Sequence, residues 1–324
     1  MNKTLKLLLI IGCSLVFLGG IVFVICLATS GWNLRSFFNV QVEYKTFEYK
    51  MFEEKTDNEI TSVSIDYNVA NVVVYVSADT ETLSVKYPQM QNKKGENIAQ
   101  ITVQETQNAL SIKETDVKTS FNIFNFEPSY VSVYLPQNRV YALNLQSETG
   151  SITLQSGNLQ TSNILLETTT GMISSKNCTL SCTGEAHFET TTGMVSVGEL
   201  SAQSVVLETT TGYVKAHNSI TAQTSVSLKS NTGRVETLGV ITANSVAMET
   251  NTGDVNATGE IRASLITLET TTGDVKALIG GKKADFTIVV SYDTGDSNIH
   301  SQTGGAKTLN VSTDTGDIQV TFTE

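Results

Sequence analysis

The stretch that decides the fold is GDVNATGEIRASLITLETTTG, residues 253–273. Its closing phrase, which ends in Thr-Gly, recurs along the C-terminal half of the chain. The glycines of the successive copies are Gly150, Gly171, Gly193, Gly212, Gly233, Gly253, Gly273, Gly295 and Gly316, which are 21, 22, 19, 21, 20, 20, 22 and 21 residues apart. A fixed period of about 20 residues is typical of a solenoid, in which each repeat buries its apolar face against its neighbours.

Within the unit, apolar residues take every second position: Ile261, Ala263 and Leu265, then Ile266 and Leu268. This alternation, with many Thr and Val, predicts strands rather than helices. Each unit should supply about two short strands and two turns, that is, one coil of about 20–21 residues in an all-β parallel β-helix. A propeller is excluded because a blade needs about 40 residues.

The glycines should form corners at which the chain takes a positive φ angle. The residue two positions after the glycine is Val or Ile in every copy except one, where it is Ser297. The threonine before each glycine should stack on its copies in the neighbouring coils.

The N-terminus contains an uncharged apolar stretch of 22 residues, 7–28. This length crosses a hydrocarbon core of about 30 Å and exceeds the apolar part of a secretory signal. Lys3 and Lys6 precede it, so the positive-inside rule places the N-terminus in the cytoplasm and the chain after Trp32 outside. We therefore predict one uncleaved transmembrane helix, although the end of the stretch, residues 26–28, also resembles a cleavage site.

The sequence divides into five parts on these grounds. They are a cytoplasmic tail (1–6), a transmembrane helix (7–28), a juxtamembrane stalk or strand that enters the solenoid (29–58), an irregular first part of the solenoid (59–140) and the regular Thr-Gly repeats (141–324). The predicted location is the cell membrane, crossed once, with the C-terminal domain extracytoplasmic.

Charge and cysteine content narrow the function classes. The chain has 21 basic and 32 acidic residues, a net charge of −11. Such a surface repels nucleic acid and anionic polymers, so a nucleic-acid partner is excluded.

Only Cys178 and Cys182 follow the apolar stretch, and about 13 Å of strand separates them, so we expect no disulfide between them.

Several motifs before the regular repeats follow the order found in a known family. They are ITSVSID (60–66), VVVYV (72–76), LSVKYP (83–88), LSIKE (110–114) and VSVYLP (131–136), followed by the Gly-Asp-Val repeats. Over about residues 59–324 the chain resembles the bacterial putative-adhesin family, a domain of unknown function. The resemblance implies a β-solenoid, often anchored in a membrane, and it brings no catalytic residues or cofactor.

No catalytic constellation emerges from the sequence. Asp293-Thr-Gly and Asp314-Thr-Gly spell the aspartic-protease signature twice, but that enzyme needs two facing loops from two lobes, and these copies lie one coil apart. His187, His217 and His300 share no column of the repeat, so neither a zinc site nor a histidine-based triad is indicated. We predict no enzymatic activity and no cofactor.

The residue after the glycine becomes acidic toward the C-terminus, at Asp254, Asp274, Asp296 and Asp317. In register these carboxylates would lie about 5 Å apart and repel by about 0.8 kcal/mol in bulk water. A second acidic column holds Glu167, Glu189, Glu208, Glu249 and Glu269, with Lys229 interrupting it. The Asp column is a candidate cation ladder, because Ca²⁺ prefers several carboxylate oxygens, or it is a solvated edge.

The sequence as a whole favours a membrane-anchored solenoid that serves as a surface interaction or structural module for an unknown protein or cell-envelope partner. Two alternatives stay open. One is a β-helix that binds or cleaves polysaccharide, which should carry a basic or aromatic-lined groove. The other is an accessory or sensor protein of the envelope stress response, which should use a flat acidic face.

Overall fold

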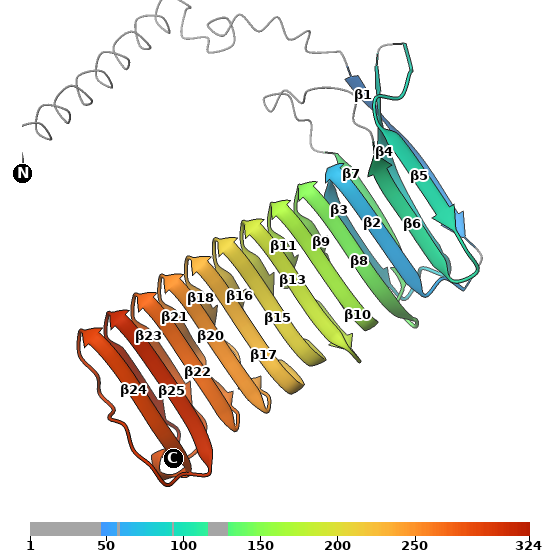
Figure 1. Cartoon of the computed structure of the whole chain (residues 1–324). Helices are drawn as coiled ribbons and strands as arrows, with labels where there is room; N and C mark the ends of the chain where they lie inside the picture. Colours follow the sequence, from blue (N-terminus) through green and yellow to red (C-terminus); the bar gives the residue numbers. More distant parts are fainter. Residues whose placement is uncertain (1–46, 57–58, 93, 116–128) are drawn as a thin grey trace, which may run out of the picture. The chain divides into compact units, whose positions relative to one another are not determined.

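The computed structural model describes residues 47–56, 59–92, 94–115 and 129–324. Among these residues no helix is long and apolar enough to cross a membrane. The predicted tail and transmembrane helix, residues 1–28, lie outside the described residues. Strands dominate the described part, so the prediction of an all-β solenoid is confirmed (Figure 1).

Each coil has three sides, not the two strands that the sequence predicted. On the first side, parallel long strands end at the glycine corner. In spatial order they are β6 (Ala109–Thr115), β2 (Ser62–Val69), β8 (Val140–Thr149), β10 (Gly157–Thr170), β13 (Glu185–Thr192), β15 (Leu200–Thr211), β17 (Ile220–Thr232), β20 (Ser245–Thr252), β22 (Leu265–Thr272), β25 (Lys307–Thr315) and β24 (Phe286–Thr294).

The second side follows the corner and is made of short parallel strands. In spatial order these are β7 (Tyr130–Pro136), β3 (Asn71–Ser77), β9 (Ile152–Leu154), β11 (Ile173–Ser175), β14 (Val195–Val197), β16 (Val214–Ala216), β18 (Val235–Thr237), β21 (Val255–Arg262), β23 (Val275–Ile279) and β26 (Ile318–Phe322).

The third side is the one that the sequence did not separate. It is formed by β12 (Cys178–Cys182) and β19 (Ile241–Thr242), together with the first residues of β10, β15 and β17 and the last residues of β21 and β23. The alternation of inward and outward side chains restarts where this side meets the next long strand. Leu265, expected inward, is therefore 41% exposed, whereas Ile266 is buried.

The core is a stack of apolar columns along the inside of the solenoid. Val235, Val255 and Val275 occupy the second side, and Leu228 and Met248 occupy the first, all without exposed area. Each column is covered only by the coils above and below it, as expected of a solenoid. Cys178 and Cys182 are also buried in this core, each as a free thiol.

At both ends the order of strands in space departs from their order in the chain. β2 lies between β6 and β8, and β25 lies between β22 and β24. At the N-terminal end, β4 (Leu83–Asn92) and β5 (Gln100–Glu105) pair antiparallel with β7 and β6, and β1 (Phe47–Thr56) pairs with β4. At the C-terminal end a short 3₁₀ turn, η1 (Lys283–Asp285), leads into β24, which is the last strand of the stack (Figure 1).

Candidate functional site

The glycine corner is the most regular feature of the molecular surface. Its backbone φ angles are positive, as predicted, but at Gly233 and Gly253 they are +142° and +139°, far from the left-handed helical value near +57°. Except at Gly295, each glycine N–H of the repeat donates to the carbonyl oxygen of the threonine before the next glycine in the stack, at 2.7 Å from Gly233 to Thr252. The corners therefore hydrogen-bond coil to coil through the backbone.

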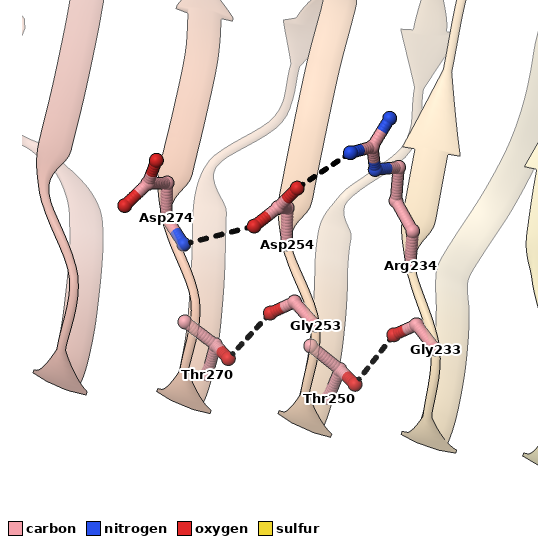
Figure 2. Close-up of polar contacts among 7 residues, drawn as sticks. All are labelled: Gly233, Arg234, Thr250, Gly253, Asp254, Thr270 and Asp274. Atoms are coloured by element: carbon pink, nitrogen blue, oxygen red, sulfur yellow. Dashed lines mark hydrogen bonds and ion pairs between the residues drawn. The ribbon is translucent and has the colours of Figure 1, made fainter.

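A column of buried hydroxyl groups caps these corners from the inside. Thr250 donates to the carbonyl oxygen of Gly233 at 2.8 Å, and Thr270 donates to that of Gly253 at 2.8 Å (Figure 2). The same contact is made by Ser147 with Ala70 and, with the preceding glycine of the stack, by Thr168, Thr190, Thr209, Ser230 and Thr313. This column was not predicted from the sequence.

The buried hydroxyl column could have been predicted from the alternation of inward and outward side chains along each long strand. Thr250 is two residues after the inward Met248, so strict alternation turns its side chain into the core. A run of three threonines hides this, because the first points inward and the next two are exposed, as at Thr270, Thr271 and Thr272.

The four candidate aspartates form one column, but not in their order along the chain. Because β25 lies between β22 and β24, the spatial order is Asp254, Asp274, Asp317 and Asp296. One carboxylate oxygen of each accepts the backbone N–H of the next: Asp274 donates to Asp254 at 3.2 Å, Asp317 to Asp274 at 2.8 Å and Asp296 to Asp317 at 2.9 Å.

This hydrogen-bonded ladder offsets part of the expected repulsion between the carboxylates, because each amide dipole directs its positive end at the neighbouring charge. Arg234 closes the inner end, with a guanidinium nitrogen 2.7 Å from the Asp254 carboxylate (Figure 2). Asp274, Asp296 and Asp317 are exposed, and no ion pair involves them among the residues that the structure describes. The ladder therefore links successive coils, and its exposed carboxylate oxygens can accept further hydrogen bonds from the solvent side.

In the described ranges, no three His, Cys, Asp or Glu side chains lie close enough together to hold a metal ion. Cation binding by the ladder stays a prediction with a clear test. We expect Na⁺ and Ca²⁺ at equal ionic strength to raise the melting temperature alike, because exposed carboxylates are stabilised by screening alone. A Ca²⁺-specific rise, lost in the Asp274→Asn/Asp296→Asn double variant, would instead establish a site that stabilises the fold by mass action.

The glutamate column is in register on the outside of the long strands. Glu167 pairs with Glu189, and Glu189 with Glu208, on successive strands. Lys229 interrupts the column as expected, and its ammonium lies 3.4 Å from Glu249. Gln146 donates to Glu167 at 3.0 Å at the other end. Lys229 thus divides the column into Glu167, Glu189 and Glu208 on one side and Glu249 and Glu269 on the other.

The histidines are separated from one another, as expected. His187 lies between Glu185 and Glu189, with nitrogen–oxygen distances of 3.7 and 3.6 Å. His217 Nε2 is 3.1 Å from Ser196 Oγ, a pair that the sequence did not predict. Burial lowers the His217 pKa, and nearby lysines act in the same direction. Ser196, on β14, is only 2% exposed, so its hydroxyl is buried.

The two Asp-Thr-Gly copies lie side by side on β24 and β25, with Thr294 paired to Thr315. Asp293 and Asp314 are both exposed on the outer surface, so they do not form the facing pair of loops that an aspartic protease needs.

Burial raises the pKa of the Cys178 thiol to about 11, which keeps it protonated and unreactive at neutral pH.

One hollow, of about 460 Å³, lies at the C-terminal end of the third side and is lined in part by Glu260, Arg262 and Lys307. Arg262 binds Glu260 at 2.5 Å, and Lys307 lies 5.3 Å from the Phe286 ring centroid. The hollow is therefore mixed in charge rather than basic. At the N-terminal end of the solenoid, the aromatic rings of Tyr75 and Tyr134 stack on each other with their centroids 5.0 Å apart. One ring face of each tyrosine is therefore covered by the other ring.

Comparison with known proteins gives one family and several distant structures. The family profile described as Toastrack DUF4097 matches residues 60–321. A putative adhesin from Bacteroides fragilis NCTC 9343 is 14% identical, with 84% of this chain and 97% of that chain covered and a TM-score of 0.41. A putative adhesin from Parabacteroides merdae ATCC 43184 is 10% identical, with 86% and 97% covered and a TM-score of 0.41.

A structure described as a putative lipid binding protein, from Parabacteroides distasonis ATCC 8503, is 12% identical, with 84% and 96% covered and a TM-score of 0.26. No curated protein gives a significant match. The match over residues 60–321 covers well over half of the chain and agrees in extent with the solenoid.

Proposed function

Because this chain belongs to the Toastrack DUF4097 family, we propose that it is a membrane-anchored interaction module without catalytic activity, which displays its solenoid outside the cytoplasm. The observation that carries the proposal is the regular outer surface of the coils. Rows of Thr, Asp and Glu side chains are held in register by a continuous hydrogen-bonded backbone. Such a surface suits recognition of another macromolecule.

Rigidity supports the display role. From β8 to β25, each coil is fixed to the next by strand pairing, by the glycine corner and by the buried hydroxyl column, as between Gly253 and Thr270. Side chains that are pre-ordered in this way lose little further freedom on binding, which lowers the entropic cost of association.

The membrane anchor rests on the sequence. The 22 uncharged residues 7–28, preceded by Lys3 and Lys6, support a single crossing with the solenoid outside. The acidic net charge of −11 supports a protein partner with a complementary basic surface, since charge complementarity gives specificity and a fast association rate.

Capture from the native envelope tests the proposed function. The full chain with a C-terminal affinity tag is cross-linked in intact cells, solubilised and purified beside a tagged version of residues 1–58. We expect the full chain to retain a specific partner that the anchor segment lacks, because the solenoid carries the recognition surface. The matched variants change charge but not shape: Asp→Asn at the four ladder positions, and Glu→Gln at Glu167, Glu189 and Glu208.

Identical material on the full chain and on residues 1–58 would contradict the interaction role. If a glycosidase releases the captured material and a protease does not, the partner is a polysaccharide rather than a protein. Loss of capture in only one of the two charge variants would locate the recognition surface on that column.

A further inference from the structure

The last strand of the solenoid has one side only partly covered. β24 pairs with β25 on its inner side. On its outer side the first half is closed by the following loop: Ile288 exchanges backbone hydrogen bonds with Gln302 at 2.8 and 2.9 Å, and the Val290 N–H donates to Ser301 Oγ at 3.0 Å. The second half, residues 292–296, which we call the terminal edge, is exposed throughout, with Tyr292 at 41%.

The interior corner at Gly253 holds the next coil with three groups. The Gly253 N–H donates to Thr272, the Gly253 carbonyl accepts the Thr270 hydroxyl, and the Asp254 carboxylate accepts the Asp274 N–H. At the terminal edge the equivalent groups are the N–H and carbonyl of Gly295 and the carboxylate of Asp296. No partner for these three groups lies among the residues that the structure describes.

The terminal edge is also strongly acidic. Asp293 and Asp296 lie on the last rung, and Asp314 and Asp317 lie on the one beneath it, all exposed and none in an ion pair within the described chain. The inner end of the same column shows how a cation is placed one rung away, because Arg234 reaches Asp254 at 2.7 Å from the corner of the neighbouring coil. The outer end has the carboxylate without the arginine.

We propose that the terminal edge binds an extended, basic segment of a partner protein, which adds to β24 as a further parallel strand and places an Arg or Lys against Asp296 as Arg234 lies against Asp254. This proposal rests on the proposed role as an interaction module and names the partner's chemistry. Unpaired strand edges are templates for such addition, with main-chain bonds giving affinity and side chains giving specificity.

A second copy of this chain is a less suitable occupant. Its own β24 edge would bring Asp293 and Asp296 against the same carboxylates, and like charges directly opposite are unfavourable. Its N-terminal end is covered by the antiparallel strands β4 and β5. A basic segment meets neither obstacle.

The chain itself supplies a probe: a fluorescent synthetic peptide with the sequence of residues 226–237, VSLKSNTGRVET, which carries the Gly-Arg corner. Its matched control replaces the arginine with aspartate. Binding to the full-length chain in mild detergent is measured by fluorescence anisotropy. We expect the arginine peptide to bind roughly fivefold more tightly at low salt, with the ratio falling as salt rises, because the added contact is an exposed ion pair.

Three variants of the full chain locate the binding. Tyr292→Pro should abolish it, because proline removes an outward N–H and blocks the edge while being tolerated on an edge strand. Asp296→Asn should reduce the ratio between the peptides to roughly twofold or less, since the paired charge is lost. Asp254→Asn should leave binding unchanged, because its carboxylate already pairs with Arg234. Circular dichroism and melting checks that each variant is folded.

Absence of binding, equal binding of both peptides, or equal losses in Asp254→Asn and Asp296→Asn would each overturn the proposal. Concentration-dependent self-association that Tyr292→Pro removes would replace the basic segment with a second copy. If envelope capture succeeds while the peptide fails, the interaction role stands and its surface lies elsewhere. If the peptide binds while capture fails, the edge is competent but the interaction role loses its support.

Discussion

Gly233→Val is expected to lower the free energy of unfolding by about 2–6 kcal/mol. Two penalties add at this corner. A φ angle of +142° belongs to a region that β-branched residues avoid, which costs about 1–3 kcal/mol. In addition, a Cβ atom here would lie 1.8 Å from the carbonyl oxygen of Gly212 in the neighbouring coil, and overpacking of this kind costs about 1–3 kcal/mol.

Gly304→Val is the matched control for the Gly233 variant. Gly304 also has a positive φ angle, +107°, but a Cβ atom there would meet nothing within 4 Å. This variant therefore carries the backbone penalty without the collision. Denaturant unfolding of both variants and of the unmodified chain separates the two terms.

Equal losses in the two variants would show that the coil-to-coil collision is relieved by a small shift of the stack. An unchanged stability of Gly233→Val would contradict the close approach of successive corners. The sequence alone predicted only the φ penalty, because the contact with Gly212 arises from the stacking of coils, which the linear repeat does not describe.

The repeat predicted the solenoid, its coil length and the glycine corners, because period and alternation are properties of each unit by itself. The family resemblance drawn from the motifs between Ile60 and Pro136 is likewise confirmed. The number of sides was wrong, because the third side carries very short strands, such as β19 (Ile241–Thr242), that merge with the alternation of the next long strand.

The exchanged order of the last coils could not be read from the glycine spacing, since Gly295 and Gly316 are both about one period from their neighbours in sequence. One signal did mark the end of the stack. The two residues that break the repeat, Tyr292 in the hydroxyl column and Ser297 in the Val/Ile column, both belong to the terminal coil. A coil with no neighbour beyond it does not need the residues that fit against one.

For the aspartate column too, the sequence predicted the position of the residues but not their contacts. The sequence placed the four carboxylates at one corner and predicted their mutual repulsion. Their hydrogen bonds to successive backbone amides depend on the exact height of each coil, as between Asp317 and Asp274 at 2.8 Å. Arg234, which closes the column, was present in the sequence at the same corner position and gave the available clue.

The central claim, a solenoid displayed outside a membrane by an N-terminal anchor, is tested most directly by protease accessibility in intact cells. The full chain carries a different epitope tag at each end, each joined through a cleavage site for one added sequence-specific protease. We expect the C-terminal tag to be removed from intact cells or spheroplasts, and the N-terminal tag to be removed only after lysis. This expectation follows from Lys3 and Lys6, which precede the apolar stretch 7–28 and predict this orientation by the positive-inside rule.

The second measurement is whether the tagged chain stays in the membrane fraction. An uncleaved anchor keeps the N-terminal tag and the solenoid in one membrane-bound chain after an alkaline wash. Protection of the C-terminal tag together with cleavage of the N-terminal tag in intact cells would contradict the orientation, and a solenoid released without its N-terminal tag would contradict the anchor.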